Sequence, residues 1–390
     1  MIVIADDITG AAEIAGIAFS CGQPVRLLCG DTVAANGTTV VATDTRSLSA
    51  SEAAAETLRL ASHLSPLASH LFKKTDSALR GHVVEELTAL MEATGYQRTV
   101  FLPANPSKGR IIRGGVYYIK EVCGESGEVR DVPLHETAFS YDPEFPATTS
   151  VLQERFPDAE SKGIIMPDAE SEDDIRRVVV RYDDGKTLFA GAADLFKVLL
   201  EVRSERRTVS DLSPLTSHPS PLTKLILCGS TQSKPLDIGI PIYPMPREVY
   251  DGVQTAQDWY NAIASTILAT QNCQLPTVNC QLSTVNSLIL SIPHTHRTGK
   301  AIAVHLRTVM AEMTRLILAP LHLESTGTGS DLHLIIEGGA TAWATLQALG
   351  WKQFEIVRQV APGVVQMRAE CGALVTLKPG SYPWGPLLEQ

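Results

Sequence analysis

Two aspartates, Asp6 and Asp7, follow the apolar run that begins the chain, and Thr9 and Gly10 come directly after them. A carboxylate at the end of a strand can accept a proton from a substrate or hold a cation. An aspartate at the start of a helix is also an ordinary N-cap, whose side chain accepts a backbone N–H. The spacing of these residues leaves both interpretations open.

A second cluster of polar residues reads KKTDSALRGH and begins at Lys73. Its basic members, among them Lys74 and Arg80, can bind a carboxylate or a phosphate, and an arginine can do so through two N–H groups. Asp76 and Ser77 lie between them. A solvated turn is the alternative, but charges of both signs, hydroxyls and a glycine between a strand and a helix favour a binding site.

The segment FLPANPSKGR forms a third cluster, in which prolines bracket and stiffen the loop around Asn105. Lys108, Arg110 and Arg113 follow and can face an anionic substrate, although ordinary surface charges would give the same sequence pattern. The TDTR segment, residues 43–46, is a weaker candidate of the same kind.

Three turns of glycine and small residues follow apolar runs in the second half of the chain. They are CGSTQS with Ser230, GGAT at 338–341 and LKPG with Gly380. Glycine lets a backbone approach a ligand closely, and the N–H groups at the start of a helix suit a phosphate. Each turn alone is typical of a tight connection without a ligand, but three on one sheet edge can together hold a nucleotide.

Several other chemistries lack their signatures in this sequence. No Gly-x4-Gly-Lys-Ser/Thr loop, Gly-x-Gly-x-x-Gly fingerprint or Gly-x-Ser-x-Gly elbow occurs, which disfavours Walker-type NTPases, standard dinucleotide folds and α/β-hydrolases. No His-Glu-x-x-His pair occurs either, and the seven cysteines are scattered without a Cys-x2-Cys pair. We therefore expect neither a zinc site nor a disulfide framework, and we assign no metal ligands.

Alternating strands and helices position the first three clusters. Apolar runs of strand length alternate with segments of helical periodicity, and Ser49 with Glu52 forms a capping-box signature at one helix start. The strands expected are 1–5, 24–30, 38–44, 70–75 and 98–106, and the helices are 9–20, 49–61 and 81–95. Such βα units predict a largely parallel sheet flanked by helices, in which ligands lie beyond the carboxyl ends of the strands.

The second half of the chain predicts a further α/β domain. Residues 208–223 are rich in Ser, Thr and Pro and are interpreted as a linker, which divides the chain into domains 1–207 and 224–390. Between 115 and 205 the pattern is weaker, with helices expected near 171–181 and 191–203. The second domain should contain strands at 224–230, 334–337 and 374–378 and a long helix at 299–318.

Composition limits the class of protein. The 390 residues are 44% hydrophobic and 19% charged, as in a soluble globular protein, and the net charge of −10 argues against a nucleic-acid partner. No apolar run approaches the ~20 residues that span a membrane. The carboxylates near the start are unlike a signal peptide, so we expect a cytoplasmic protein without a membrane partner, and we leave a homodimer open.

These motifs together resemble the four-carbon acid sugar kinase family, formerly catalogued as a domain of unknown function. ADDITGA resembles the family's Ala-Asp-Asp-Leu-Thr-Gly-Ala, KKTDSALRGH its Lys-x-Asp-Ser-x-x-Arg-Gly and FLPANPSKGR its Pro-Ala-x-Pro-x-x-Gly-Arg. GSTQS, GGAT and LVTLKPGSY resemble its Gly-Ser, Gly-Gly-x-Thr and Leu-Lys-x-Gly elements. The matches run in the family's order over nearly the whole chain.

The resemblance implies two α/β domains with the active site in the cleft between them. The N-terminal domain would bind a threonate, erythronate or 3-oxo-tetronate type of acid, and the C-terminal domain would bind ATP with Mg²⁺ for transfer to the terminal hydroxyl. Asp7, with Asp6, would be catalytic. The acid would meet Lys74, Asp76, Ser77, Arg80, Asn105 and Arg110, and ATP would meet Ser230, Gly338, Gly339, Ala340, Thr341 and Gly380.

The chain departs from the family pattern in two places. The segment after the Gly-Ser turn is rich in proline where the family has a helix, and Ser381-Tyr382 stands where the family commonly has Asn-Phe-Gly. A non-catalytic binding protein of the same fold, or another enzyme acting on small hydroxy acids, is therefore the alternative function.

Overall fold

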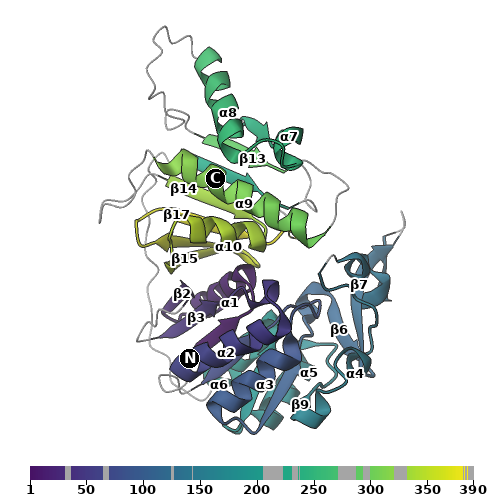
Figure 1. Ribbon diagram of the computed structural model, residues 1–390. Coiled ribbons are helices and arrows are strands. Elements are labelled where there is room, and N and C mark those ends of the chain that lie inside the picture. Colours follow the sequence, from purple (N-terminus) through teal and green to yellow (C-terminus); the bar gives the residue numbers. More distant parts are fainter. Residues whose placement is uncertain are drawn as a thin grey trace. The chain divides into compact units, whose positions relative to one another are not determined.

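The chain divides into two compact units, Met1–Ser213 and Pro214–Gln390 (Figure 1). The computed structural model describes residues 1–30, 37–64, 70–123, 127–142, 144–204, 223–230, 236, 238–270, 287–292, 299–319, 332–380, 382 and 384. The division falls within the predicted linker, 208–223, which lies outside the described residues except for Thr223. The substrate and nucleotide roles of the two units stay predictions.

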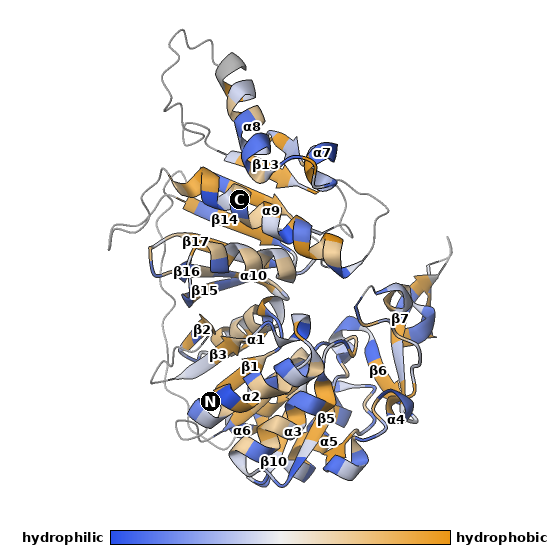
Figure 2. Ribbon diagram, in the orientation of Figure 1, coloured by the Kyte–Doolittle hydropathy of each residue, from blue (hydrophilic) through white to orange (hydrophobic). Residues whose placement is uncertain are grey.

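A parallel sheet forms the centre of the first unit, with strands in the order β2-β3-β1-β4-β10-β5-β9. Most of these strands are buried along their length, because helices cover both faces of the sheet, and the apolar strands β1 and β5 stand out in Figure 2. The strands are β1 (Ile2–Ala5), β2 (Val25–Cys29), β3 (Thr38–Ala42), β4 (Leu71–Lys74), β5 (Arg98–Leu102), β9 (Ile164–Ile165) and β10 (Thr187–Gly191).

The helices of the first unit form two groups, α1 with α6 and α5, and α2 with α3, whose members pack against one another. Ser49 and Glu52 cap α2 reciprocally: the Ser49 N–H donates to Glu52 Oε2 at 2.9 Å, and the Glu52 N–H donates to Ser49 Oγ at 3.4 Å. The predicted capping box is therefore confirmed. The helices are α1 (Ile8–Ser20), α2 (Ala50–Leu64), α3 (Val83–Thr94), α4 (Leu152–Arg155), α5 (Glu172–Tyr182) and α6 (Ala193–Ser204).

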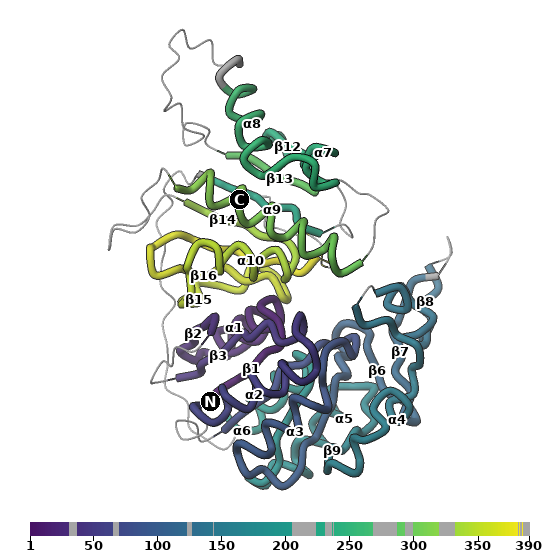
Figure 3. Tube along the Cα trace, viewed as in Figure 1, coloured from purple at the N-terminus to yellow at the C-terminus, as the bar shows by residue number. Residues whose placement is uncertain are grey.

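A separate antiparallel sheet follows β5, where the sequence pattern predicted no strands. It contains β6 (Arg110–Arg113), β7 (Val116–Cys123) and β8 (Glu128–Pro133), which lie side by side in Figure 3. Gly114 and Gly115 connect the first two strands with φ of 58° and 72°. Two consecutive positive φ angles are typical of a type I′ hairpin turn, so the Gly-Gly pair was the signal that the sequence analysis missed.

The second unit contains a mixed sheet in the order β12-β13-β11-β14-β17-β16-β15. Its strands are β11 (Thr223–Cys228), β12 (Ile242–Pro244), β13 (Ser287–Ser291), β14 (Leu332–Glu337), β15 (Gln353–Ala361), β16 (Val364–Ala369) and β17 (Leu374–Lys378). The strands from β12 to β17 in this order pair in parallel, as predicted, whereas β15, β16 and β17 pair antiparallel. That meander was not predicted from the sequence, although Gly363 and Gly372, both at positive φ, mark its turns.

Helices of the second unit are α7 (Arg247–Tyr250), α8 (Ala256–Thr270), α9 (Lys300–Leu318) and α10 (Gly339–Ala348). The long helix predicted at 299–318 is confirmed, and its buried residues include Leu306, Val309 and Met313. No helix among the described residues is long and apolar enough to cross a membrane. The predicted class, α/β with largely parallel sheets flanked by helices, is confirmed for the fold.

Candidate functional site

The first two polar clusters and the TDTR segment follow adjacent strands of the first unit. Ala5, the last residue of β1, pairs with Ala42 of β3 on one side and with Lys74 of β4 on the other. Because all three strands are parallel, the residues that follow them leave the sheet at the same edge. Strand register therefore brings Asp6 and Arg46 to the KKTDSALRGH cluster.

Arg46 is the central cation of this charged group. Its Nε and Nη2 donate to Asp6 Oδ2 at 2.9 and 2.8 Å, and Nη2 also lies 3.3 Å from Asp7 Oδ1 and 3.6 Å from Asp76 Oδ1. One guanidinium thus contacts three carboxylates. From the sequence alone the TDTR segment was a weak candidate, because the position of its strand, β3, beside β1 is not evident there.

Asp6 is buried, and its pKa is raised because burial disfavours the charged form, although Arg46 acts in the opposite direction. Its second oxygen, Oδ1, is buried without a hydrogen-bond partner in the described part of the chain. Gly81 lies beside this carboxylate, since a Cβ added there would stand 3.2 Å from Asp6 Oδ2.

Asp7 is the N-cap of α1. Its Oδ1 accepts the Gly10 N–H at 2.9 Å, and its Oδ2 accepts the Thr9 hydroxyl at 2.6 Å. Burial opposes ionisation, yet Arg46, Lys74 and the Thr9 hydroxyl hold the pKa of Asp7 below its usual value. The capping interpretation is therefore realised, and the catalytic role of Asp7 stays a prediction.

The two lysines at the end of β4 point to opposite faces of the sheet, as strand alternation requires. Lys73 forms an ion pair with Glu86 of α3, and both side chains are buried. Lys74 donates to the Thr75 carbonyl at 2.9 Å and lies 3.7 Å from Glu13 of α1. Lys74 is thus on the face of α1 and Asp7, and Lys73 contributes to the opposite layer.

Asp76 and Arg80 form a bidentate ion pair. Arg80 Nε and Nη2 each donate to a different Asp76 oxygen at 2.9 Å, and Arg80 Nη1 donates to Asp142 Oδ2 at 3.3 Å. Burial opposes ionisation of Asp76, but Arg80 and Arg46 hold its pKa well below the usual value. Asp76 is therefore a fixed anion that orients Arg80, whose side chain remains 30% exposed.

Arg110 connects the third cluster to the second, because its Nη1 donates to the Ser77 hydroxyl. The buried Tyr117, from β7, donates its hydroxyl to the Ser77 carbonyl oxygen. The structure thus brings Ser77, Arg80 and Arg110 together, as the sequence analysis expected, and adds a tyrosine that it had not considered.

Asn105 supports the fold around this cluster. It is buried, its Oδ1 accepts the Asp194 N–H of α6 at 3.1 Å, and its backbone exchanges hydrogen bonds with Arg110 at 2.8 and 3.1 Å. These contacts hold the strand that carries Arg110 against the start of α6. The predicted substrate contact of Asn105 stays a prediction.

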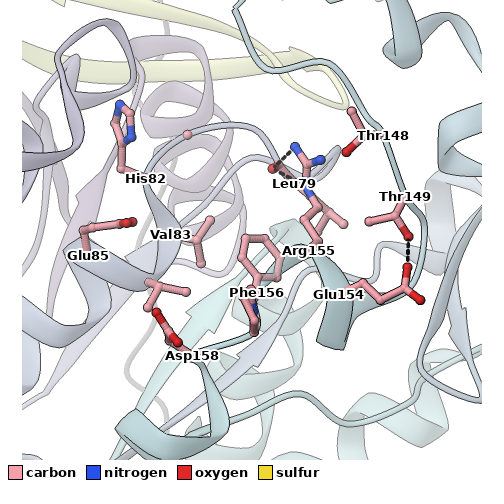
Figure 4. A pocket seen from close by; sticks show the side chains of 13 residues that line it. Leu79, His82, Val83, Glu85, Thr148, Thr149, Glu154, Arg155, Phe156 and Asp158 are labelled. Atoms are coloured by element: carbon pink, nitrogen blue, oxygen red, sulfur yellow. Dashed lines mark hydrogen bonds between the residues drawn. The ribbon is translucent and has the colours of Figure 1, made fainter.

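A pocket of about 440 Å³ lies beside the KKTDSALRGH turn (Figure 4). Leu79, at a φ of 63°, contributes to its wall, and Arg155 donates to the Leu79 carbonyl oxygen at 3.3 and 3.1 Å. Glu85, Glu154 and Asp158 also line it. The lining combines Arg155 with three carboxylates, whose negative charge would repel an anionic acid. This pocket is therefore a poor match for such a ligand.

The three glycine turns of the second unit meet at one edge of its sheet. Cys228 of β11 pairs with Glu337 of β14, which pairs with Lys378 of β17, all in parallel. The following residues, Ser230, Gly338 and Gly380 among them, therefore leave the sheet together. The strand order therefore brings the three turns together, as predicted.

Side chains of the turns fill the space beside two of the glycines. A Cβ added at Gly229 would stand 2.7 Å from Thr341 Cβ, and one added at Gly380 would stand 2.8 Å from Ser230 Cβ. Thr341 is buried. Gly229 and Gly380 thus allow the turns to pack closely, and the expected contact of the Thr341 side chain with ATP would need that packing to open.

A buried ion pair lies beneath the glycine turns. Lys378 Nζ donates to Glu337 Oε1 at 2.6 Å and to the Pro379 carbonyl oxygen at 3.1 Å, and it lies 4.7 Å from the centroid of the Trp384 ring. Both charged side chains are fully buried. Glu337 Oε2 is buried without a hydrogen-bond partner among the described residues.

The start of α10 has the properties of an anion site. Its N-cap, Gly338, has φ 93°, no side chain caps the helix, and the first turn contains no acidic residue. Gly338 and Gly339 are half-buried and Ala340 is exposed. Backbone N–H groups in a first helical turn lack partners within the helix and carry its positive dipole end, so phosphate oxygens suit this position.

The chain resembles known proteins in both sequence and fold. Residues 1–159 match the family model of the sugar-binding N-terminal domain. A 3-oxo-tetronate kinase of Pectobacterium atrosepticum is 31% identical over 135 residues, which is 32% of this chain and 32% of that kinase. A D-threonate kinase of Salmonella typhimurium is 31% identical over 160 residues, 40% of this chain and 35% of that kinase. The chain thus spans about a third of the length of these curated relatives.

Solved structures share the fold at low identity. A Haemophilus influenzae protein of family DUF1537 is 19% identical with a TM-score of 0.62, over 98% of this chain and 97% of that protein. A Salmonella typhimurium LT2 structure is 19% identical with a TM-score of 0.68, over 98% and 96%. The fold is that of a two-unit α/β protein whose first 159 residues match the model of the sugar-binding N-terminal domain. These similarities confirm the predicted resemblance to the four-carbon acid sugar kinase family.

Proposed function

We propose that this protein is an ATP-dependent kinase that phosphorylates the terminal hydroxyl of a four-carbon sugar acid. One observation carries the proposal: each unit gathers its polar motifs at the carboxyl ends of parallel strands, and the two sites differ in kind. The first is a cluster of arginines and carboxylates, and the second is a set of glycine turns at a helix start. A sugar-acid kinase needs one site of each kind, and relatives named 3-oxo-tetronate kinase and D-threonate kinase agree with that division.

In the first unit, we assign the carboxylate of the acid to Arg80 and Arg110. Arg80 pairs with Asp76 and Arg110 donates to the neighbouring Ser77 hydroxyl, and guanidinium groups bind carboxylates through paired N–H donors. Asp7 would orient the attacking hydroxyl, since its lowered pKa makes it a reliable acceptor. Phosphoryl transfer requires mainly such positioning, together with a base or orienting group for the attacking hydroxyl.

In the second unit, we assign the phosphates of ATP to the first turn of α10, beside the Ser230 and Gly380 turns. Mg²⁺ would neutralise charge on the transferred phosphoryl group. The described residues contain no group of three or more His, Cys, Asp or Glu arranged to hold a metal. We therefore expect the ion to be bound together with the nucleotide, partly through phosphate oxygens.

A coupled ADP-release assay tests the proposal with the stereoisomers of threonate, erythronate and 3-oxo-tetronate as acceptors. We expect ADP release that depends on one of these acids, with mass spectrometry showing a phosphorylated acid. A reaction without acid controls for simple ATP hydrolysis. Acid binding without ADP release, together with no ATP-dependent rise in melting temperature, would instead identify a binding protein or an enzyme that does not use ATP.

A further inference from the structure

Phe139 contacts two arginines that come from different motifs. It lies in the short 3-10 helix η5 (Ala138–Tyr141), after the antiparallel sheet, and is half-buried. The guanidinium carbon of Arg80 lies 5.6 Å from the centroid of its ring, and that of Arg110 lies 5.7 Å from it. Both distances fall within the range of cation–π attraction.

The segment that carries Phe139 is held in place by its own hydrogen bonds. The Phe139 N–H donates to Thr137 Oγ1 at 3.3 Å, and the Ala147 N–H donates to the Phe139 carbonyl oxygen at 3.0 Å. Asp142, directly after η5, accepts Arg80 Nη1 at 3.3 Å. The ring is thus part of an ordered wall beside the two arginines.

Gathering two guanidinium groups on one ring requires a physical reason, because like charges at short distance repel. Asp76 neutralises Arg80 through two hydrogen bonds, and Asp142 accepts a third from it. Arg110 is attracted by Asp76 as well, but its described hydrogen bond goes to the neutral Ser77 hydroxyl. A ring face attracts a cation and leaves the N–H edges of a guanidinium available for hydrogen bonds in its plane. An arrangement of this kind suits an additional anion that bridges the two arginines.

We propose that the Phe139 ring is a shared platform that holds Arg80 and Arg110 as a two-armed clamp for the carboxylate of the substrate. The inference rests on the proposed function for the identity of that substrate, a small hydroxy acid. Phe139 is a positioning residue, since it acts on the acid through the two arginines. The alternative is that Phe139 only packs against its neighbours. The clamp requires a flat, electron-rich ring face for binding of the acid, whereas packing requires only an apolar side chain of suitable volume.

Phe139→Leu tests the clamp, because leucine keeps an apolar side chain and loses the ring face. Isothermal titration with D-threonate, without nucleotide, should show a Kd raised roughly three- to thirtyfold, the range expected for the loss of cation–π contacts. In turnover, KM should rise in the same proportion while kcat changes by less than about twofold. Affinity for threitol, the four-carbon polyol without a carboxylate, should not change.

Conservative variants and a matched control separate positioning from packing. Phe139→Tyr and Phe139→Trp keep a ring face and should restore binding to nearly the wild-type Kd. Tyr141→Leu removes an aromatic residue that is 85% exposed in the same short helix and should have no effect. In an Arg110→Ala background, the loss caused by Phe139→Leu should shrink, as coupled residues require. If Phe139→Leu has a melting temperature well below that of the wild type, Phe139→Met, whose side chain also fills much of the volume of the ring, replaces it in these experiments.

The outcomes distinguish this inference from the proposed function. Wild-type protein that binds D-threonate but transfers no phosphate would refute the proposed kinase activity. The Kd values of the Phe139 variants for D-threonate would still test the clamp. Wild-type turnover together with unchanged D-threonate binding in Phe139→Leu would overturn the clamp and leave the kinase standing. Equal losses for threonate and threitol would show packing only. A wild-type protein that binds no acid of the panel would overturn both.

Discussion

Asp6 and Asp7 are consecutive residues with opposite electrostatic environments. Burial raises the pKa of Asp6, and one of its oxygens has no hydrogen-bond partner among the described residues. Asp7 is partly buried, which opposes its ionisation, but two hydrogen bonds and two nearby cations stabilise its anion and lower its pKa. An ordered carboxylate whose pKa is lowered suits the orientation of a hydroxyl, and it also caps a helix.

Asp7→Asn separates these two contributions. Asparagine is about as good an N-cap as aspartate, so the melting temperature should fall only by the lost attraction of the carboxylate to Arg46 and Lys74. Loss of the charge should lower kcat by roughly two to four decades, the usual contribution of general acid–base catalysis. ADP release and thermal denaturation measure the two effects. If Asp6→Asn abolishes turnover while Asp7→Asn does not, the roles of the two residues are reversed.

His333 makes the stability of the second unit depend on pH. It is buried in β14, where its Nε2 lies 2.8 Å from Thr376 Oγ1, and burial followed by the charges of Lys224 and Arg358 lowers its pKa to about 4. An unfolded chain protonates this histidine near pH 6.5. The contribution of neutral His333 to the free energy of unfolding is therefore fully present above pH 6.5, and it is lost as the pH falls toward 4.

The loss from His333 should be on the order of 3 kcal/mol over that pH interval. His333→Gln keeps a polar side chain without the titration, so its melting temperature should fall less between pH 7 and pH 4.5 than that of the wild type. Carboxylates elsewhere affect both proteins alike. Parallel pH profiles for the two proteins would show that His333 does not titrate in this way.

At the scale of elements, turns at the ends of parallel strands position both candidate sites. In the second unit, side chains of one turn occupy the space beside the glycine of another, as Thr341 does at Gly229 and Ser230 at Gly380. Interiors are packed too densely to accept a further carbon there without displacement. The glycines therefore determine how closely the turns approach, and α10 presents its first turn beyond them.

Gly339, the first residue of α10, provides a test of the phosphate site. Gly339→Asp introduces a carboxylate where the helix favours negative charge, so the helix itself should tolerate it. That charge should repel phosphate and raise the Kd for ATP by more than about tenfold, a charge-sized effect. Gly339→Asn has nearly the same shape without the charge and is the matched control. Equal ATP binding by the Asp and Asn variants would contradict the assignment.

At the scale of the whole molecule, two compact units should respond to two different ligands. A ligand that binds only the folded state stabilises it by about 2.7 kcal/mol at a hundredfold excess over Kd. Calorimetry of the full chain should show stabilisation by ATP and, separately, by the acid. Arg80→Ala should lose only the response to the acid, and Gly339→Asp only the response to ATP. Loss of both responses in either variant would contradict the division of roles.

The sequence by itself determined the local features of this protein. Apolar runs, helical periodicity, the Ser49–Glu52 cap and glycines after strands depend on neighbouring residues, and each was placed where the structure has it. The same patterns indicated the fold class and the resemblance to sugar acid kinases. Hairpin signals at Gly114–Gly115 and Gly363 were also local, and they were missed because the α/β pattern dominated the interpretation.

Only the tertiary structure decided which charges meet. Arg46 is separated from Asp6 by forty residues and became its partner because β3 lies beside β1. Phe139 joined Arg80 and Arg110 through a segment whose sequence has no pattern of its own. Strand order depends on crossover connections, and ion pairs form wherever that order brings opposite charges together. Neither the strand order nor the pairing of charges is encoded within a short stretch of chain. The partners of the motif residues therefore followed from the fold.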